Sequence, residues 1–258
     1  MVKYYGQHGE DYLVNRIFNG KKNGFFVEIG CLDGIDYSNT YFFEQAGWKG
    51  ICVEAHNDFI TKLKTNRKNS TIIHCAVGEK NIDDVVFYAN KIGSLSTLDK
   101  KEEARWEKNY KEFFTGFEEQ HVPMRTLTNI FDEQQVKEID FISLDIEGYE
   151  VQALTGLDLN KYRPRLFIIE YKDEEHKAAL DVILLNSRYY LLGKIGCNLF
   201  YGTHAEDKNI IMARHRAINM VLPLSDGTEI TKKIYFGKPG IIERIKNKIL
   251  SVISPSKK

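Results

Sequence analysis

Short apolar runs that alternate with stretches of helical period constrain this chain more than any other feature. The runs that have the length of a buried strand cover residues 24–30, 50–55, 71–78, 84–89, 140–148 and 165–171. Segments of helical spacing follow most of them, at residues 38–46, 58–67, 151–157 and 174–187. Strands that alternate with helices form βαβ units, so the pattern predicts a parallel sheet. The runs are continuously apolar, which indicates that helices cover both faces of that sheet.

Two regions depart from this rhythm. Residues 99–121 are dense in charged and aromatic side chains, which predicts a helical insertion. Farther along, the runs at 189–195, 198–203 and 219–224 predict antiparallel strands that close the edge of the sheet. Neither a repeat nor a linker rich in Pro, Gly and Ser is found. We therefore expect one domain over residues 1–205, and a C-terminal extension over residues 206–258.

The charge of the chain excludes some partners. Its 36 Lys+Arg and 36 Asp+Glu give a formal net charge of +0, which argues against a protein that binds nucleic acid over its whole surface. Residues 232–258, however, hold eight basic residues and one acid, so the remainder of the chain is acidic. Within this tail isoleucines recur every four residues, at Ile241, Ile245, Ile249 and Ile253. A basic amphipathic helix here would contact an anionic membrane surface, another subunit or its own domain.

The expected compartment is the cytoplasm. The four cysteines form no CxxC pair, which disfavours a zinc site or a disulfide scaffold. The polar N-terminus has no apolar signal core. No run approaches the roughly 18 apolar residues that a membrane span requires.

The strongest motif is Glu28-Ile-Gly30-Cys-Leu-Asp33-Gly34, between the first expected strand and its helix. Glycines let the backbone approach a ligand closely, and ligands of open α/β sheets bind beyond the carboxyl ends of the strands. Glu54 ends the second expected strand, where an acid can accept both hydroxyl hydrogens of a ribose. The two features together predict a nucleoside-binding site.

The acids in the motif select among nucleoside cofactors. A dinucleotide site favours G-x-G-x-x-G, whereas this chain has E-x-G-x-x-x-G with acids at Glu28 and Asp33. Negative charge is unfavourable beside a pyrophosphate, but it suits a ligand with an ammonium and a sulfonium group. The motif therefore favours S-adenosylmethionine over NAD.

A second motif, residues 143–150, follows the expected strand at 140–148 and contains three acids. Acids at the end of a strand can orient an acceptor, take its proton or hold a metal ion. They can also cap the next helix without a role in chemistry. We expect a functional role for Asp145, leave Glu147 open between the two, and place Glu150 on the helix surface.

Together these motifs resemble a known family. YGQHGED, FFVEIGCLDG, CVEA, HCAVG, GSLSTL, TLTNIF, SLDIEGYEVQALTGL and RLFIIEY stand in the order found in FkbM-type methyltransferases, over residues 4–200. The resemblance implies a class I, Rossmann-like α/β fold with a mostly parallel seven-stranded sheet, flanking helices and an antiparallel edge. It also implies S-adenosylmethionine-dependent O-methylation, often of sugar hydroxyls. Many members have Lys where this chain has Ser143, so a role of that Lys does not carry over.

The resemblance also implies roles for single residues. Glu28, Gly30 and Gly34 would hold the methionine end of the cofactor, Glu54 its ribose, and Ala76 would border its adenine. The leading segment would fold over the cofactor, and the loop with Ser94 and Ser96 would close the site. The complete set of expected cofactor residues is Gln7, Glu28, Gly30, Asp33, Gly34, Ser38, Glu54 and Ala76, with Asp11 beside Gln7.

Methyl transfer to a hydroxyl requires positioning and a base within hydrogen-bond reach. The catalytic candidates are Asp145, Glu170 and His176, although His176 fits a helix surface equally well. Alternatively, Asp145 and Glu170 hold a divalent cation that acidifies vicinal hydroxyls. The expected acceptor is a sugar or nucleotide-activated sugar of surface (capsular) polysaccharide synthesis. The alternatives are a lipid or natural-product hydroxyl, a non-catalytic binding module, and an NAD-dependent oxidoreductase.

Overall fold

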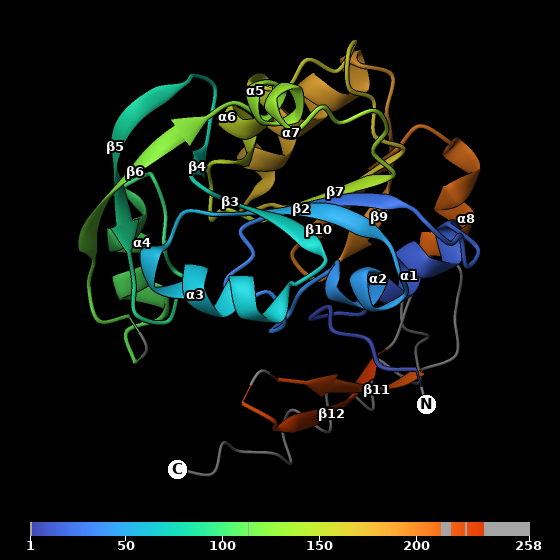
Figure 1. Ribbon diagram of the computed structural model, residues 1–258, viewed down its shortest axis with the longest axis horizontal. Helices are drawn as coiled ribbons and strands as arrows, with labels where there is room; N and C mark the ends of the chain where they lie inside the picture. Colours follow the sequence, from blue (N-terminus) through green and yellow to red (C-terminus); the bar gives the residue numbers. More distant parts are fainter. Residues whose placement is uncertain (1, 113, 213–217, 225, 235–258) are drawn as a thin grey trace.

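A seven-stranded sheet forms the centre of the protein, in the order β3-β2-β1-β7-β8-β10-β9. The computed structural model describes residues 2–112, 114–212, 218–224 and 226–234 (Figure 1). Only β10 runs against its neighbours. The predicted α/β architecture, a mostly parallel sheet with one antiparallel strand near its edge, is confirmed. The strands are β1 (Phe25–Ile29), β2 (Lys49–Glu54), β3 (Ser70–His74), β7 (Phe141–Leu144), β8 (Leu166–Glu170), β9 (Tyr190–Ile195) and β10 (Asn198–Gly202).

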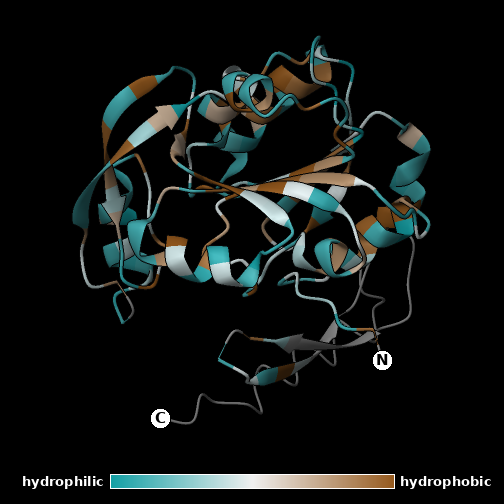
Figure 2. Cartoon of the chain, in the orientation of Figure 1, coloured by the Kyte–Doolittle hydropathy of each residue, from teal (hydrophilic) through white to brown (hydrophobic). Residues whose placement is uncertain are grey.

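Helices cover both faces of this sheet (Figure 1). One face carries α1 (Glu10–Ile17), α2 (Tyr41–Gln45) and α3 (Asn57–Asn66), and the other α5 (Leu127–Glu133), α6 (Glu150–Thr155) and α7 (Glu174–Asn186). Successive side chains of a strand point to opposite faces, so Val27 and Ile29 enter one apolar core and Phe26 enters the other. Figure 2 shows the resulting apolar strands between helices of mixed polarity. The continuous apolar runs are thus explained by burial on both faces.

A second, three-stranded sheet lies beside the first. Its order is β4-β6-β5, and its strands are β4 (Ala76–Val77), β5 (Ile82–Ala89) and β6 (Glu118–Arg125). The run expected as one strand at 71–78 is therefore divided at Cys75 between the two sheets. Phe87, Val122 and Met124 join Ala76 in an apolar cluster on the small sheet. This cluster fixes the small sheet next to the carboxyl ends of β2 and β3.

The insertion expected over 99–121 is only partly helical. Helix α4 covers Glu102–Asn109 and buries Trp106 against Phe114 and Phe117. From residue 118 the chain is already in β6, so the predicted helix is wrong there. In β6 burial alternates, with Gln120, Val122 and Met124 inward, which is the period of a strand rather than a helix.

Of the three apolar runs predicted as C-terminal strands, two join the central sheet and one does not. The runs at 189–195 and 198–203 become β9 and β10. The run at 219–224 does not reach the sheet edge, because β11 (Ile218–Pro223) pairs with β12 (Glu229–Ile234) in a separate hairpin, which corrects that prediction. Between them lie the short helices η1 (Ala205–Asp207) and α8 (Lys208–Met212).

Packing continues beyond residue 205, where we expected the domain to end. Asp207 accepts hydrogen bonds from the Arg165 guanidinium at 2.9 and 3.0 Å, and Ile211 is buried against Gly193. The basic amphipathic helix expected over 241–253 lies outside the described residues. None of the helices in the described ranges combines the length and apolarity needed to cross a membrane.

Candidate active site

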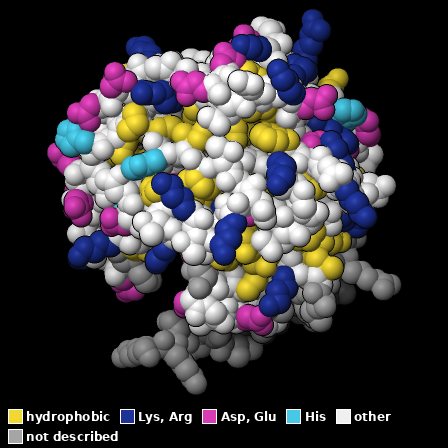
Figure 3. Space-filling model, viewed as in Figure 1, with side chains coloured by type: hydrophobic (Ala, Val, Ile, Leu, Met, Phe, Trp, Pro, Cys, Tyr) yellow, Lys and Arg dark blue, Asp and Glu magenta, His cyan; other side chains and the backbone are white. Residues whose placement is uncertain are grey.

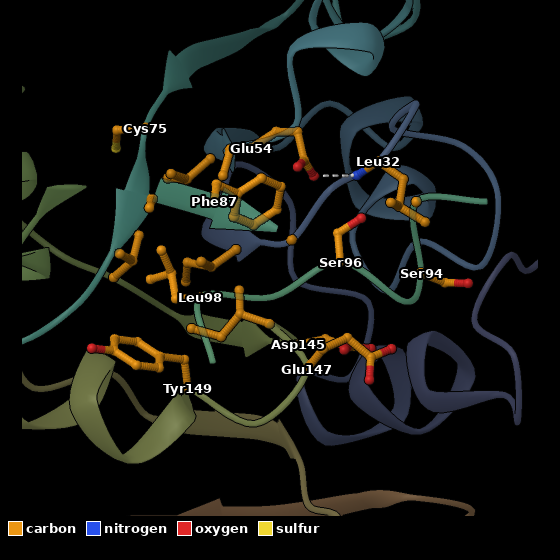
Figure 4. Close-up of a pocket in the computed structure, with 18 residues that line it drawn as sticks. Leu32, Glu54, Cys75, Phe87, Ser94, Ser96, Leu98, Asp145, Glu147 and Tyr149 are labelled. Carbon is orange, nitrogen blue, oxygen red and sulfur yellow. Dashed lines mark hydrogen bonds between the residues drawn. The ribbon is translucent and has the colours of Figure 1, made fainter. Parts of the chain in front are cut away.

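A pocket opens at the carboxyl ends of β1, β2 and β7, next to the small sheet (Figure 4). Its space is about 650 Å³, including the part that is open to solvent. This is the edge of the sheet at which open α/β folds bind ligands. We call it the cofactor pocket; its lining residues are Ile29, Gly30, Leu32, Val53, Glu54, Ala55, Cys75, Ala76, Val77, Phe87, Gly93, Ser94, Ser96, Leu98, Asp145, Ile146, Glu147 and Tyr149.

Glu54 is the last residue of β2, and backbone N–H groups hold its carboxylate in place. One oxygen accepts the N–H of Leu32 at 2.7 Å, and the other accepts the N–H of His56 at 2.7 Å (Figure 4). Burial raises the pKa of the Glu54 carboxyl to about 7. Each carboxylate oxygen has a second lone pair, so a pair of ligand hydroxyls can still donate to it. This geometry suits the ribose role predicted for Glu54.

The part of the pocket nearest the small sheet is apolar. Phe87, Leu98 and Tyr149 lie around it (Figure 4), and Cys75, Ala76 and Val77 complete this side. Flat apolar walls with a few polar groups at one end are typical of sites for planar ligands. The structure places Ala76 there, as expected for a residue that borders adenine.

Gly30 brings the ends of β1 and β7 together. Its φ of +83° lies in the left-handed region, and a Cβ atom added to it would lie 1.8 Å from the carbonyl oxygen of Asp145. The Asp145 N–H donates to the Ile29 carbonyl at 3.1 Å. Only glycine therefore allows the Asp145 loop to reach the cofactor pocket.

The carboxylate of Glu28 does not line the cofactor pocket. It accepts hydrogen bonds from Ser38 Oγ at 2.9 Å and Thr40 Oγ1 at 2.7 Å, and it pairs with the fully buried guanidinium of Arg67 at 3.1 Å. Arg67 also pairs with Glu44 at 2.8 Å. We predicted cofactor contacts for Glu28 and Ser38, whereas these side chains satisfy a buried cation that comes from α3.

Asp33 and Gly34 also lie outside the pocket lining. The Asp33 carboxylate accepts the N–H groups of Ile35 and Asp36 and so caps its own turn, at 2.9 and 3.0 Å. Gly34 has a φ of +86°, and an added Cβ would lie 2.6 Å from Cγ of Arg67. Both residues shape the loop rather than contact the pocket, which corrects the expectation that acids of this motif face a sulfonium.

The leading segment lies beside the pocket rather than in its lining. Gln7 is exposed, and the buried Asp11 accepts the N–H groups of Tyr5 at 2.6 Å and Tyr12 at 2.9 Å. Burial raises the pKa of Asp11 to about 7. The neighbouring Glu10 is tied to β10. We expected Gln7 and Asp11 to fold over the cofactor. Instead, Asp11 accepts hydrogen bonds from the backbone of its own segment.

Four acids gather at the ends of β7 and β8, and we call them the acid cluster: Asp145, Glu147, Glu150 and Glu170. A carboxylate oxygen of Asp145 lies within 4.8 Å of one of Glu170. Burial raises the pKa of Asp145 to about 6 and that of Glu150 to about 7, and burial together with the charge of Asp145 raises those of Glu147 and Glu170 well above the usual range. Glu150 is fully buried, so its expected place on the helix surface is wrong. Such a cluster can take a proton or hold a cation.

His176 lies behind the acid cluster rather than in the pocket lining. Its Nδ1 accepts the N–H of Lys172 at 3.3 Å, and its Nε2 lies 3.3 Å from Oε2 of Glu150. Burial lowers the pKa of the imidazole. The ring is only 7% exposed, so the alternative of a surface position is wrong. The structure brings His176 into contact with an acid that we did not expect it to meet.

The insertion is fastened over the acid cluster. Thr97 Oγ1 donates to the Glu147 carbonyl at 3.0 Å. Glu102 of α4 pairs with Lys172 at 2.6 Å and with Arg105 at 2.8 Å. The loop that precedes this insertion brings Ser94 and Ser96 into the pocket lining, where a closing loop was expected (Figure 4).

Sequence reasoning missed the apolar lining. Phe87 lay in a recognised strand, and Leu98 and Tyr149 lay inside quoted motifs, but nothing in the sequence indicated that they meet. Their meeting depends on the small sheet, whose strand β6 was not predicted.

On the face in Figure 3, basic and acidic side chains are interspersed.

Comparisons with known proteins concern most of the chain. The profile of the family described as "Methyltransferase FkbM domain" matches residues 28–191. No curated protein matches the sequence.

Among similar solved structures are a ribosomal protein L11 methylase from Lactobacillus delbrueckii subsp. bulgaricus and an O-methyltransferase from Bacillus cereus in complex with SAH. The first is 9% identical and covers 76% of this chain and 77% of its own, with a TM-score of 0.43. The second is 11% identical and covers 78% of this chain and 84% of its own, with a TM-score of 0.43. Fibrillarin from Aeropyrum pernix with natively bound S-adenosyl-L-methionine is 11% identical and covers 76% and 74%, with a TM-score of 0.39. At such low identities and TM-scores these likenesses carry no argument about function.

Proposed function

Because the chain belongs to the family of methyltransferases with an FkbM domain, we propose that it transfers a methyl group to the oxygen of a sugar hydroxyl. The match over residues 28–191 confirms the family that the motifs predicted. The seven-stranded sheet with antiparallel β10 is the class I methyltransferase fold. The methyl donor is S-adenosylmethionine.

The residues of the cofactor pocket fit this donor. Glu54 has two carboxylate oxygens available for the ribose, and the apolar wall with Ala76 and Phe87 suits the adenine. Asp145 and Glu147 supply negative charge on the other side of the pocket (Figure 4), which complements an ammonium and a sulfonium group. The bound donor supplies an electrophilic methyl group, and the residues of the chain orient it.

The position of Asp145 is the observation on which the assignment of a hydroxyl acceptor rests. Asp145 lines the cofactor pocket, and its carboxylate lies within 4.8 Å of that of Glu170 in the acid cluster. A hydroxyl must lose its proton as its oxygen attacks, so it requires a base or a cation at this position. The acid cluster supplies carboxylates for either route.

Polar groups around Asp145 support a sugar over a lipid. Glu147, Glu170 and the hydroxyl of Ser94 offer several hydrogen-bond acceptors close to one another. A polyol can donate to several acceptors at once, whereas an acyl chain would leave them without partners. A nucleotide-activated sugar used in surface polysaccharide synthesis is the acceptor that we propose.

Calorimetric titration of the folded protein with S-adenosylmethionine and with NAD tests the first step. We expect saturable heat with the former alone. Release of S-adenosylhomocysteine is then measured with a panel of nucleotide sugars and of lipid alcohols. Folded protein that binds no S-adenosylmethionine would refute the proposal, and turnover with lipid alcohols alone would refute the sugar.

Replacement of Asp145 tests its role at the acceptor. Asp145→Asn should lower kcat by about 10²–10⁴-fold, since it removes the charge that activates the hydroxyl. The Kd for S-adenosylmethionine should rise by a much smaller factor than kcat falls, because Glu147 and the ribose and adenine contacts remain. Asp84→Asn, an exposed acid of β5, is the control. Equal kcat values in the two variants would contradict the assignment.

A further inference from the structure

Three carboxylates of the acid cluster converge from separate elements, and we call them the carboxylate trio: Asp145 after β7, Glu150 at the start of α6 and Glu170 at the end of β8. One oxygen from each lies within 4.8 Å of the other two. Glu150 is buried whereas Asp145 and Glu170 are partly exposed, and like charges at such spacing repel one another. The trio therefore requires a proton or a bound cation between its members.

Glu150 shows that the trio lacks a partner. Its Oε1 accepts the N–H groups of Ile146 at 2.9 Å and Gly148 at 3.2 Å. Its Oε2 is buried and lies 3.3 Å from Nε2 of the buried His176, but neither of these two atoms forms a hydrogen bond of good geometry. Buried polar atoms are almost always satisfied in native proteins. An orphan carboxylate oxygen within reach of two further carboxylates points to a missing ligand of positive charge.

The chain offers no fixed cation to fill this role. In the ranges that the structure describes, no Lys or Arg forms an ion pair with a member of the trio. Lys172 and Arg105 come from neighbouring elements, but both pair with Glu102 instead. His176 faces Glu150 from a buried position that disfavours its charged form. A bound cation can supply the charge that these side chains do not.

We propose that Asp145, Glu150 and Glu170 bind one divalent cation of the oxygen-seeking kind, such as Mn²⁺, Ca²⁺ or Mg²⁺. This proposal rests on the proposed function, since the cation would serve the same methyl transfer. Such cations take carboxylate oxygens at about 2.0–2.6 Å, and ligands on opposite sides of an ion are separated by up to twice that length. The spacing within the trio meets this requirement. Three carboxylates also leave positions for water or for two vicinal hydroxyls of a sugar.

The cation would deepen the role of Asp145. Because Asp145 also lines the cofactor pocket, an ion on the trio lies next to the donor. A hydroxyl bound to the ion loses its proton to solvent more readily than a free one. Its oxygen then forms a bond to the methyl carbon while the carbon–sulfur bond breaks. The products are a methyl ether, S-adenosylhomocysteine and one proton.

Mn²⁺ binding to the full chain, treated first with a chelator and then dialysed, provides the test. Calorimetry and the electron paramagnetic resonance of free Mn²⁺ both measure the affinity. Wild type should bind one Mn²⁺, and Glu150→Gln should weaken this binding by about tenfold or more. The amide oxygen of Gln can still cap Ile146 and Gly148, so the substitution removes charge and preserves shape. Glu147→Gln, an acid of the same cluster outside the trio, should change the Mn²⁺ affinity by less than threefold.

Absence of Mn²⁺ binding to wild type would overturn the proposal, and so would an equal loss in the two variants. Titration of the same samples with S-adenosylmethionine separates the two hypotheses. Donor binding without Mn²⁺ binding refutes the cation alone, whereas folded protein that binds no donor refutes the proposed function. Thermal unfolding checks each variant, and Glu170→Gln replaces Glu150→Gln if the latter does not fold.

Discussion

Glu54 illustrates how one side chain couples cofactor binding to pH. Burial raises its pKa to about 7 in the free protein, and hydroxyl donors of a ribose favour the ionised form. The donor therefore binds the ionised carboxylate, and affinity is lost as the pH falls through 7. Between pH 8 and pH 6 the Kd for S-adenosylmethionine should rise about tenfold, measured by calorimetry. Glu54→Gln should bind weakly with a flat pH profile; a flat wild-type profile would contradict this account.

Gly30 offers a second test at the scale of one residue. A methyl group there would collide with the Asp145 carbonyl, whereas Gly47 has a φ of +93° with open space around it. Gly47→Ala should lose only about 1–2 kcal/mol of stability from the left-handed conformation, which lowers the Tm by a few degrees. Gly30→Ala should lower the Tm at least twice as far, or prevent folding. Similar shifts in thermal scans of the two variants would show that the loops do not require this close approach.

Single residues also show where sequence reasoning succeeds. Gly30, Glu54 and Asp145 were identified because each lies at the end of a strand, where parallel strands bring their carboxyl ends together, whereas Ala76 came from the family resemblance. Glu28 was misjudged because its partner, Arg67, lies 39 residues away and nothing local announces it. A motif predicts where an acid lies in the chain, but the role of that acid depends on the charged side chains that pack against it.

At the scale of elements, α4 acts as a clamp. Glu102 joins α4 to Lys172, which follows β8, and so holds the insertion over the acid cluster. Glu102→Gln should raise the rate of amide hydrogen exchange in α4 by about three- to tenfold, since the opening of the helix costs less. The affinity for S-adenosylmethionine should stay the same, because Glu102 does not line the pocket. Glu107→Gln on the exposed side of α4 is the control, and equal exchange in both variants would exclude the clamp.

Elements differ in how well their sequences predict them. Strands β1, β2, β7 and β8 are mostly apolar because both of their faces are buried, and they were recognised. Strand β6 reads EEQHVPMR, which is apolar only at alternate positions and contains a proline. Its identity is settled by pairing with β5, and that is a contact between distant residues. Local patterns predicted the central sheet, and long-range pairing created the small one.

For the whole molecule, the boundary of the folded unit can be measured. A chain that ends after Met212 keeps all seven strands of the central sheet and the buried Ile211, and loses the exposed pair Lys3–Glu229, which water screens. Its Tm should fall by only a few degrees and its S-adenosylmethionine affinity by less than threefold. A chain that ends at residue 205 loses the Asp207–Arg165 pair and Ile211, so its Tm should fall farther. Equal Tm values would place the boundary at residue 205.

The bond between Asn198 and Glu10 has a consequence for biosynthesis. Asn198 Nδ2 of β10 donates to Glu10 at 2.9 Å across 188 residues, and Glu10 is close enough to Asp145 to raise the pKa of that acid. The residues that line the cofactor pocket end at Tyr149, so they leave the ribosome well before β10 does. A nascent chain can therefore contain every residue that lines the pocket while its first helix still lacks the partner that anchors it. Synthesis supplies Glu170 of the acid cluster and strand β10 only afterwards.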